Sequence, residues 1–210
     1  MQVRPTYMNH SSDKINIAIF ASGGGSNARK IVEYFQDSSI IEVGLIVSNR
    51  KNAGVLKLAD EYKISSILLS KDLFYDDKEA ISAILANYEI KYIILAGFLW
   101  MVPSYLVELY SNKMLNIHPS LLPKYGGAGM YGHHVHEAVH NAKEKYSGMT
   151  IHLVNEHYDK GNILFQASTD ISHCTSADEI AAEVLCLEHE HYAHIIEEYI
   201  TKTEGMRSSK

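Results

Sequence analysis

Two polar side chains, Asn116 and His118, stand two residues apart in the stretch NIHPSLLPKY. Residues 113–117 predict a strand, on which residues two apart point to the same face, ~6–7 Å from one another. An amide can donate a hydrogen bond to a developing oxyanion, and an imidazole with a pKa of ~6.5 exchanges protons near neutrality. Pro119 breaks the strand and holds His118 at its mouth. The pair suits oxyanion and proton-transfer chemistry on one substrate. On these residues alone, an ordinary core or surface histidine is the alternative.

A carboxylate, Asp159, lies in the stretch NEHYDKG, where a strand pattern gives way to a glycine-containing turn and then resumes. Its side chain is therefore expected at the same edge of the sheet as His118. A carboxylate near a histidine stabilises the imidazolium and raises its pKa. The alternative is a turn aspartate that bonds its own backbone.

The turn SGGGSN follows the apolar run INIAIFA and includes Gly25, Ser26 and Asn27. Backbone N–H groups and the N-terminus of the following helix meet there, which suits a phosphate group. The same turn also fits the pattern GxGxxA, and Arg50 after the second strand could meet a 2′-phosphate. A dinucleotide site and a tight turn without a ligand therefore both remain open.

The letters HEAVH, formed by His136, Glu137 and His140 with the residues between them, match the zinc-peptidase pattern HExxH. Such a peptidase needs its third ligand on a helix, here offered only by the NExxD match around Glu156. Gly161 and the strand-forming run MTIHLV bracket that segment and predict a turn between strands. We therefore expect no zinc site, and we expect the remaining histidines on solvated faces.

The elements that must position these residues alternate between strand and helix. The pattern predicts a mainly parallel sheet with helices on both faces. Ligands bind such sheets beyond the carboxyl ends of the strands, where the residues above lie. The expected strands cover residues 15–21, 40–47, 66–69, 92–96, 113–117, 148–154 and 162–168, the last two as an antiparallel pair, and the expected helices follow residue 26 and cover 54–62, 77–88, 135–143 and 177–200. The fold class is thus α/β: a Rossmann-like, mainly parallel sheet with an antiparallel C-terminal strand pair.

Length and composition set the class of protein. The chain has 210 residues, of which 46% are hydrophobic and 21% charged, as in an ordinary globular domain. We expect a disordered leader at residues 1–13, one domain at 14–200 and a polar tail at 201–210.

A net charge of -6 disfavours a nucleic acid partner. Two cysteines without a metal or disulfide spacing, and no apolar run approaching ~20 residues, favour a cytoplasmic protein with no membrane insertion.

With these motifs in place, residues 14–200 resemble the phosphoribosylglycinamide formyltransferase family of folate-dependent enzymes in purine biosynthesis. The most specific match is LNIHPSLLPKY, supported in order by SGGGSN, LAGFLWMV, the turn around Asp159 and LEHEHY. The resemblance implies direct attack of the glycinamide ribonucleotide amine on 10-formyltetrahydrofolate, without a metal. It implies that Asn116 stabilises the oxyanion, that His118 donates the proton, and that Asp159 raises the histidine pKa and helps to order a water.

The same resemblance implies a set of binding residues. Gly25, Ser26 and Asn27 would hold the substrate phosphate, and Glu188 would contact its glycinamide end. The folate-binding residues would be Lys78, Leu99, Trp100, Met101, Val102, Asn116, Asn155, Glu156, His157, Tyr158 and Asp159. The chain departs from the family at Gly24, at Trp100 and at Gly126, which puts the fit of folate and the geometry of the loop at 126–132 in question.

Several alternatives stand beside this interpretation. Formyltetrahydrofolate hydrolases and methionyl-tRNA formyltransferases are similar but carry a further domain before or after the shared one, so the length favours the purine enzyme. An NADP-dependent dehydrogenase and a phosphate-binding module without catalysis are the alternatives from other classes. Monomer and homodimer are both compatible with the sequence.

Overall fold

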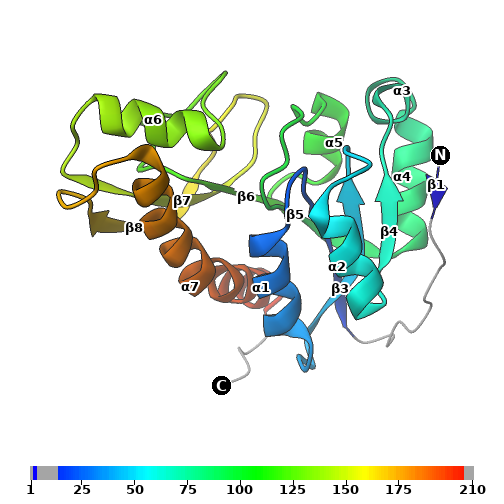
Figure 1. Cartoon of the computed structure of the whole chain (residues 1–210). Coiled ribbons are helices and arrows are strands. Elements are labelled where there is room, and N and C mark those ends of the chain that lie inside the picture. The colour runs from blue at the N-terminus through cyan, green and yellow to red at the C-terminus, as the bar shows by residue number, and fades with distance from the viewer. Residues whose placement is uncertain (1, 4–13, 206–210) are drawn as a thin grey trace.

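The structure is a computed structural model that describes residues 2–3 and 14–205, folded around one mixed sheet (Figure 1). Within those residues, eight strands lie in the order β1-β4-β3-β2-β5-β6-β7-β8. They are β1 (Gln2–Val3), β2 (Ile15–Phe20), β3 (Ile41–Ser48), β4 (Ser65–Leu68), β5 (Ile90–Leu95), β6 (Met114–His118), β7 (Tyr146–Leu153) and β8 (Ile163–Asp170). Strands β2 to β6 pair in parallel, whereas β1, β7 and β8 join antiparallel. The predicted α/β fold with its antiparallel C-terminal pair is confirmed.

Helices cover both faces of this sheet. They are α1 (Ser26–Phe35), α2 (Gly54–Tyr62), α3 (Lys71–Tyr75), α4 (Lys78–Asn87), α5 (Ser104–Leu109), α6 (His133–Asn141) and α7 (Ala177–Thr203). Buried side chains of α1, α2, α6 and α7 share one core cluster, and those of α3, α4 and α5 share the other. Figure 1 shows α6, β7 and β8 at one end of the molecule and α3 and α4 at the other.

The central strand β2 shows why the sequence folds this way. All six of its residues are buried, as expected for a parallel strand covered on both faces. Ile17 and Ile19 belong to the cluster with α1 and α7, whereas Ala18 and Phe20 belong to the cluster with α4 and α5. The continuous apolar run therefore serves two cores at once, because successive side chains on a strand point to opposite faces.

Three elements were missing from the prediction. Helices α3 and α5 are only 5 and 6 residues long, too short for a helical repeat to show in the sequence. Strand β1 pairs antiparallel with β4 inside the expected leader, of which residue 1 and residues 4–13 lie outside the described residues. Helix α7 continues to Thr203, three residues into the expected polar tail, and residues 206–210 of that tail also lie outside.

Within the part of the chain that the structure describes, none of the helices has both the length and the apolar character needed to cross a bilayer.

Candidate active site

Strand β6 ends at His118, one residue beyond the predicted strand and directly before Pro119. Asn116 and His118 lie two residues apart on this strand, and both line a cavity beyond its carboxyl end. On the antiparallel neighbour β7, Asn116 pairs in register with His152. The expected pair of side chains therefore faces a space that a small molecule can enter.

The imidazole of His118 is only 4% exposed and has a polar group beside each ring nitrogen. Nε2 lies 2.8 Å from the carbonyl oxygen of Tyr125, which can only accept, so Nε2 carries a hydrogen. Nδ1 lies 3.6 Å from Oδ1 of Asp159. A proton taken up by the neutral ring would therefore reside on Nδ1, facing the carboxylate.

The pKa of His118 is lowered from its ordinary value, chiefly because burial disfavours the charged ring. Asp159 and the Tyr125 carbonyl raise the pKa, and the neighbouring His152 lowers it. The expected influence of Asp159 is thus present, but burial outweighs it and the net direction is downward. A donor with a lowered pKa is a stronger acid.

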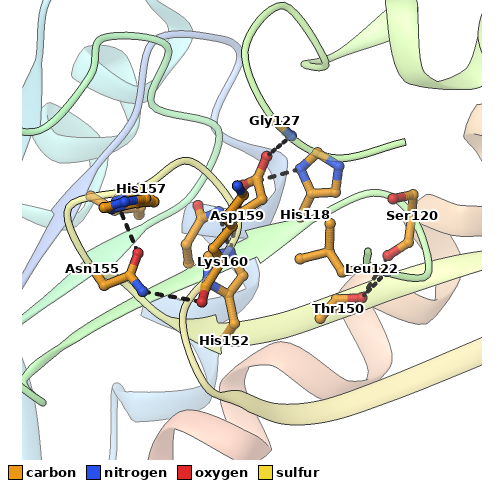
Figure 2. A network of polar contacts seen from close by, with 12 residues as sticks. His118, Ser120, Leu122, Gly127, Thr150, His152, Asn155, His157, Asp159 and Lys160 are labelled. Carbon is orange, nitrogen blue, oxygen red and sulfur yellow. Dashed lines mark hydrogen bonds and ion pairs between the residues drawn. The ribbon is translucent and has the colours of Figure 1, made fainter. Parts of the chain in front are cut away.

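Asp159 lies in the loop between β7 and β8 and adopts a left-handed backbone conformation, with φ of 53°. Its Oδ2 accepts a hydrogen bond of 2.8 Å from the backbone N–H of Gly127, and its Oδ1 faces both His118 and His152 at 3.6 Å. Figure 2 shows the carboxylate reaching toward Gly127 and His118. Burial raises the pKa of this carboxyl, but the facing ring of His118 and the N–H of Gly127 help to hold it below its usual range.

His152 is a site residue that the sequence prediction missed. It is 2% exposed, and its Nε2 lies 3.0 Å from Nδ2 of Asn116. Its Nδ1 lies 2.9 Å from the carbonyl oxygen of Leu153. The available signal was a histidine inside the strand-forming run MTIHLV, but the pairing of this run with the strand that bears Asn116 is seen only in the structure.

Three segments form the walls of the cavity around these groups: the turn after β5, the loop before α6, and the loop between β7 and β8. The lining residues are Leu95, residues 97–102, residues 116–119, residues 127–132, His152, Val154, Asn155 and residues 157–159. The predicted folate residues Leu99, Trp100, Met101, Val102, Asn116, Asn155, His157, Tyr158 and Asp159 are all among them. The cavity thus gathers most of the predicted set.

Two predicted folate residues lie elsewhere. Lys78 begins α4 on the exposed surface, where its Nζ is 3.7 Å from Glu79. Glu156 is exposed in the same loop as Asp159 but is not part of the wall. The first turn of α4 faces solvent, and Glu156 is the one residue of the stretch 155–159 that does not line the cavity.

The loop at 126–132 lies close to Leu122 and Asp159 at Gly126. A Cβ there would come 2.4 Å from Cδ2 of Leu122 and 3.3 Å from Cβ of Asp159. The loop also contributes residues 127–132 to the wall, which the folate prediction did not include. The chain's departure from the family at Gly126 therefore coincides with a tight contact beneath Asp159.

The glycine-rich turn leads into α1, as predicted. Gly25 caps the helix with φ of 82°, and no side chain caps the first backbone N–H groups. Ser26 is exposed and Asn27 is half-buried, so this helix N-terminus is open to a ligand from solvent. Free N–H groups and the partial positive charge at such an end suit an anion.

Glu188 on α7 meets this turn through Asn27, whose Nδ2 donates a 2.6 Å hydrogen bond to Oε2. The carboxyl is 8% exposed, and burial raises its pKa while the Asn27 bond offsets part of that effect. The structure therefore brings together two residues, 161 positions apart, that the sequence assigned to one substrate.

Ser22 connects the glycine-rich turn with the cavity wall. Its hydroxyl donates to Oδ1 of Asn49 at 2.7 Å and accepts from the backbone N–H of Leu99 at 2.8 Å. The side chain is buried, and its backbone N–H donates to the carbonyl of Gly97. One hydroxyl thus fixes the two strand-end turns, after β2 and β5, against each other.

The HEAVH residues are arranged for packing and surface contacts. His136 is buried, His140 donates to the Thr175 carbonyl at 3.1 Å, and Glu137 faces His133 and His134 on the exposed side of α6. Residues 2–3 and 14–205 contain no group of three or more His, Cys, Asp or Glu side chains arranged to hold a metal ion.

The comparisons with known proteins agree with this geometry. Residues 15–196 match the family described as formyl transferase. The chain is 38% identical to "Phosphoribosylglycinamide formyltransferase, chloroplastic" of Arabidopsis thaliana over 89% of its own length, and spans 66% of that protein, just under two thirds. It is 31% identical to the phosphoribosylglycinamide formyltransferase of Bacillus subtilis, over 87% of this chain and 93% of that protein.

A solved structure of a phosphoribosylglycinamide formyltransferase is also similar to this chain. The crystal structure of phosphoribosylglycinamide formyltransferase from Brucella melitensis superposes with a TM-score of 0.79 at 32% identity, covering 89% of this chain and 95% of that one. The chain therefore belongs to the formyl transferase family, with phosphoribosylglycinamide formyltransferases among its relatives.

Proposed function

We propose that the protein transfers the formyl group of 10-formyltetrahydrofolate to the amine of glycinamide ribonucleotide in purine biosynthesis. The observation that carries the proposal is the convergence of Asn116, His118 and Asp159 on one wall of a cavity, with the imidazole and the carboxylate 3.6 Å apart. The names of the relatives point to the same reaction.

Asn116 supplies the oxyanion donor. In the reaction, the substrate amine forms a bond to the formyl carbon, and the carbonyl electron pair moves onto the oxygen. One N–H of the Asn116 amide is engaged by His152, which leaves the second N–H for that oxygen. Such a donor stabilises charge that exists only after attack, so it lowers the barrier without tightening substrate binding.

His118 supplies the proton and Asp159 stabilises the protonated ring. The attacking amine must lose a proton, and the folate nitrogen must gain one as its bond to the formyl carbon breaks. The lowered pKa of His118 makes its imidazolium a good donor to that nitrogen. Asp159 stays ionised because its pKa is lowered, so its charge is available to the ring at neutral pH, and we assign it the ordering of a water for proton transfer.

The remaining residues bind the substrates. The open N–H groups of Gly25, Ser26 and Asn27 suit the substrate phosphate, and Glu188 lies next to Asn27 for the glycinamide end. Folate fits the wall at 98–102, Asn155 and 157–159, since that wall combines aromatic and aliphatic surface with a polar end at Asn116.

Trp100 takes part in this wall as a fixed element. Its ring packs against Phe74, Tyr75 and Phe98 with centroid distances of 5.9, 5.9 and 6.4 Å. We propose that it offers the folate an apolar surface at this position, where the chain departs from the family.

Location and assembly complete the proposal. Both cysteines, Cys174 and Cys186, are free thiols, which suits a reducing compartment such as the cytoplasm. All of the proposed catalytic residues come from one chain, so the same mechanism serves a monomer or a homodimer.

The test is a formyl-transfer assay with glycinamide ribonucleotide that follows deformylated folate. We expect Asn116→Ala and His118→Ala to lower kcat at least ~100-fold. Lys202→Ala, which changes an exposed residue in the last turn of α7, outside the cavity, is the control and should keep kcat and both KM values within about twofold.

Other outcomes would replace the proposal. Release of formate from formyl-folate without an acceptor would support a hydrolase instead. Binding of glycinamide ribonucleotide without turnover would support a phosphate-binding module, and a nicotinamide absorbance change on adding NADPH would support a dehydrogenase.

A further inference from the structure

The hydrogen bonds around His152 determine which of its nitrogens carries the proton. The carbonyl oxygen of Leu153 lies 2.9 Å from Nδ1 and can only accept, so Nδ1 is the N–H donor. In a neutral ring the other nitrogen, Nε2, then has a lone pair and no hydrogen. Nε2 lies 3.0 Å from Nδ2 of Asn116, so the amide is the donor in that contact.

The surroundings hold this arrangement in place. Asn116 and His152 are paired residues on neighbouring antiparallel strands, and the imidazole is 2% exposed. Gly161 packs directly on the Leu153 carbonyl, where a Cβ would come 1.6 Å from the oxygen and 3.4 Å from Nδ1 of the ring. The acceptor that selects the tautomer is therefore confined between β7 and the start of β8.

We propose that His152 is a positioning residue that fixes the amide of Asn116 in one of its two orientations. This inference rests on the proposed function. If the amide were turned by a half rotation, its Oδ1 would face the Nε2 lone pair, and two acceptors would meet in a buried site. The orientation with Nδ2 toward His152 makes a hydrogen bond instead, and it leaves the second N–H of the same nitrogen free for the developing oxyanion.

The neutral ring is required for this role. If Nε2 were protonated, its N–H would face the N–H of Asn116, and the two donors would repel. The Nε2 hydrogen would instead point toward Oδ1 of Asp159, 3.6 Å away. The same carboxylate oxygen faces His118 Nδ1 at 3.6 Å. A neutral His152 therefore leaves Asp159 to the ring of His118 and keeps the oxyanion donor in its working orientation.

Two substitutions separate orientation from general packing. His152→Leu removes the acceptor, so the amide can turn, and we expect kcat to fall about 10- to 100-fold while both KM values stay within about threefold. His152→Gln offers a carbonyl oxygen that can accept from Asn116. We expect its kcat to be at least about tenfold higher than that of His152→Leu. A rise in both KM values together with a loss of stability, and no recovery by glutamine, would overturn the positioning role.

A measurement without turnover reads the tautomer directly. In the ¹⁵N spectrum of the imidazole rings, the His152 signals are those that disappear in His152→Gln. They should show Nδ1 protonated and Nε2 unprotonated at neutral pH. A protonated Nε2 would overturn the inference whatever the kinetics. If wild-type protein fails to transfer formyl groups, the proposed function fails, and the ring spectrum still decides the orientation.

Discussion

One buried histidine should make the folded protein sensitive to acid. His136 on α6 is 7% exposed, and its Nδ1 has no hydrogen-bond partner. Burial, followed by the proximity of His133 and His118, lowers its pKa from 6.5 to about 4. The unfolded chain therefore takes up this proton at higher pH than the folded chain does.

The size and sign of the effect follow from that difference. Between pH 6.5 and about 4 the unfolded state holds one more proton, so lowering the pH favours unfolding, and above pH 6.5 the group has no effect. Each pH unit contributes about 1.4 kcal/mol. When the pH falls from 7 to 4.5, about two pH units lie within this range. The titration of His136 should therefore lower the free energy of unfolding by about 3 kcal/mol.

The assay is urea unfolding at pH 7 and pH 4.5 for wild type, His136→Leu and His136→Gln. Carboxylates also titrate in this range, so the quantity of interest is the difference between wild type and variant. Wild type should lose about 3 kcal/mol more than His136→Leu on acidification. The control is His134→Gln, at an exposed position of the same helix, which should behave as wild type. Equal losses in wild type and His136→Leu would refute the reasoning.

Three further predictions concern the site. Gly25→Ala places a Cβ at φ of +82° and against α2, so the KM for the ribonucleotide should rise about tenfold. In the control Gly24→Ala, the added Cβ lies in open space and the backbone has no positive φ, so the KM for the ribonucleotide should change less than threefold. Equal KM changes in the two variants would contradict this prediction. Ser22→Ala leaves the Leu99 N–H without its partner, so urea unfolding should show a loss of about 1–3 kcal/mol and the KM for formyl-folate should rise; no change in either would count against the link. Asp159→Asn removes the charge that raises the pKa of the His118 imidazole. If His118 has the proposed role, the rate limb that needs the protonated ring should move to lower pH in a kcat profile, and an unmoved limb would exclude that role.

Much of the fold could be predicted because it is encoded by local patterns. The run Ile15–Phe20 is apolar throughout because both faces of β2 are buried, and the alternation with helical segments indicated a parallel sheet. The placement of Asn116 and His118 was equally local, since two residues on one strand share a face and Pro119 ends it. The short helices α3 and α5 were missed because one or two turns are too short to show a period.

The sequence by itself determined which residue types stand at the strand ends, whereas the tertiary structure decided how they meet. The contact of Asn116 with His152 joins residues 36 positions apart, and that of Gly127 with Asp159 joins residues 32 apart. These contacts depend on the register of β6 with β7 and on the path of a long loop, neither of which a local pattern specifies. Burial likewise decided the net direction of the His118 pKa, which the raising influence of Asp159 alone did not determine, because desolvation depends on every segment packed around the ring.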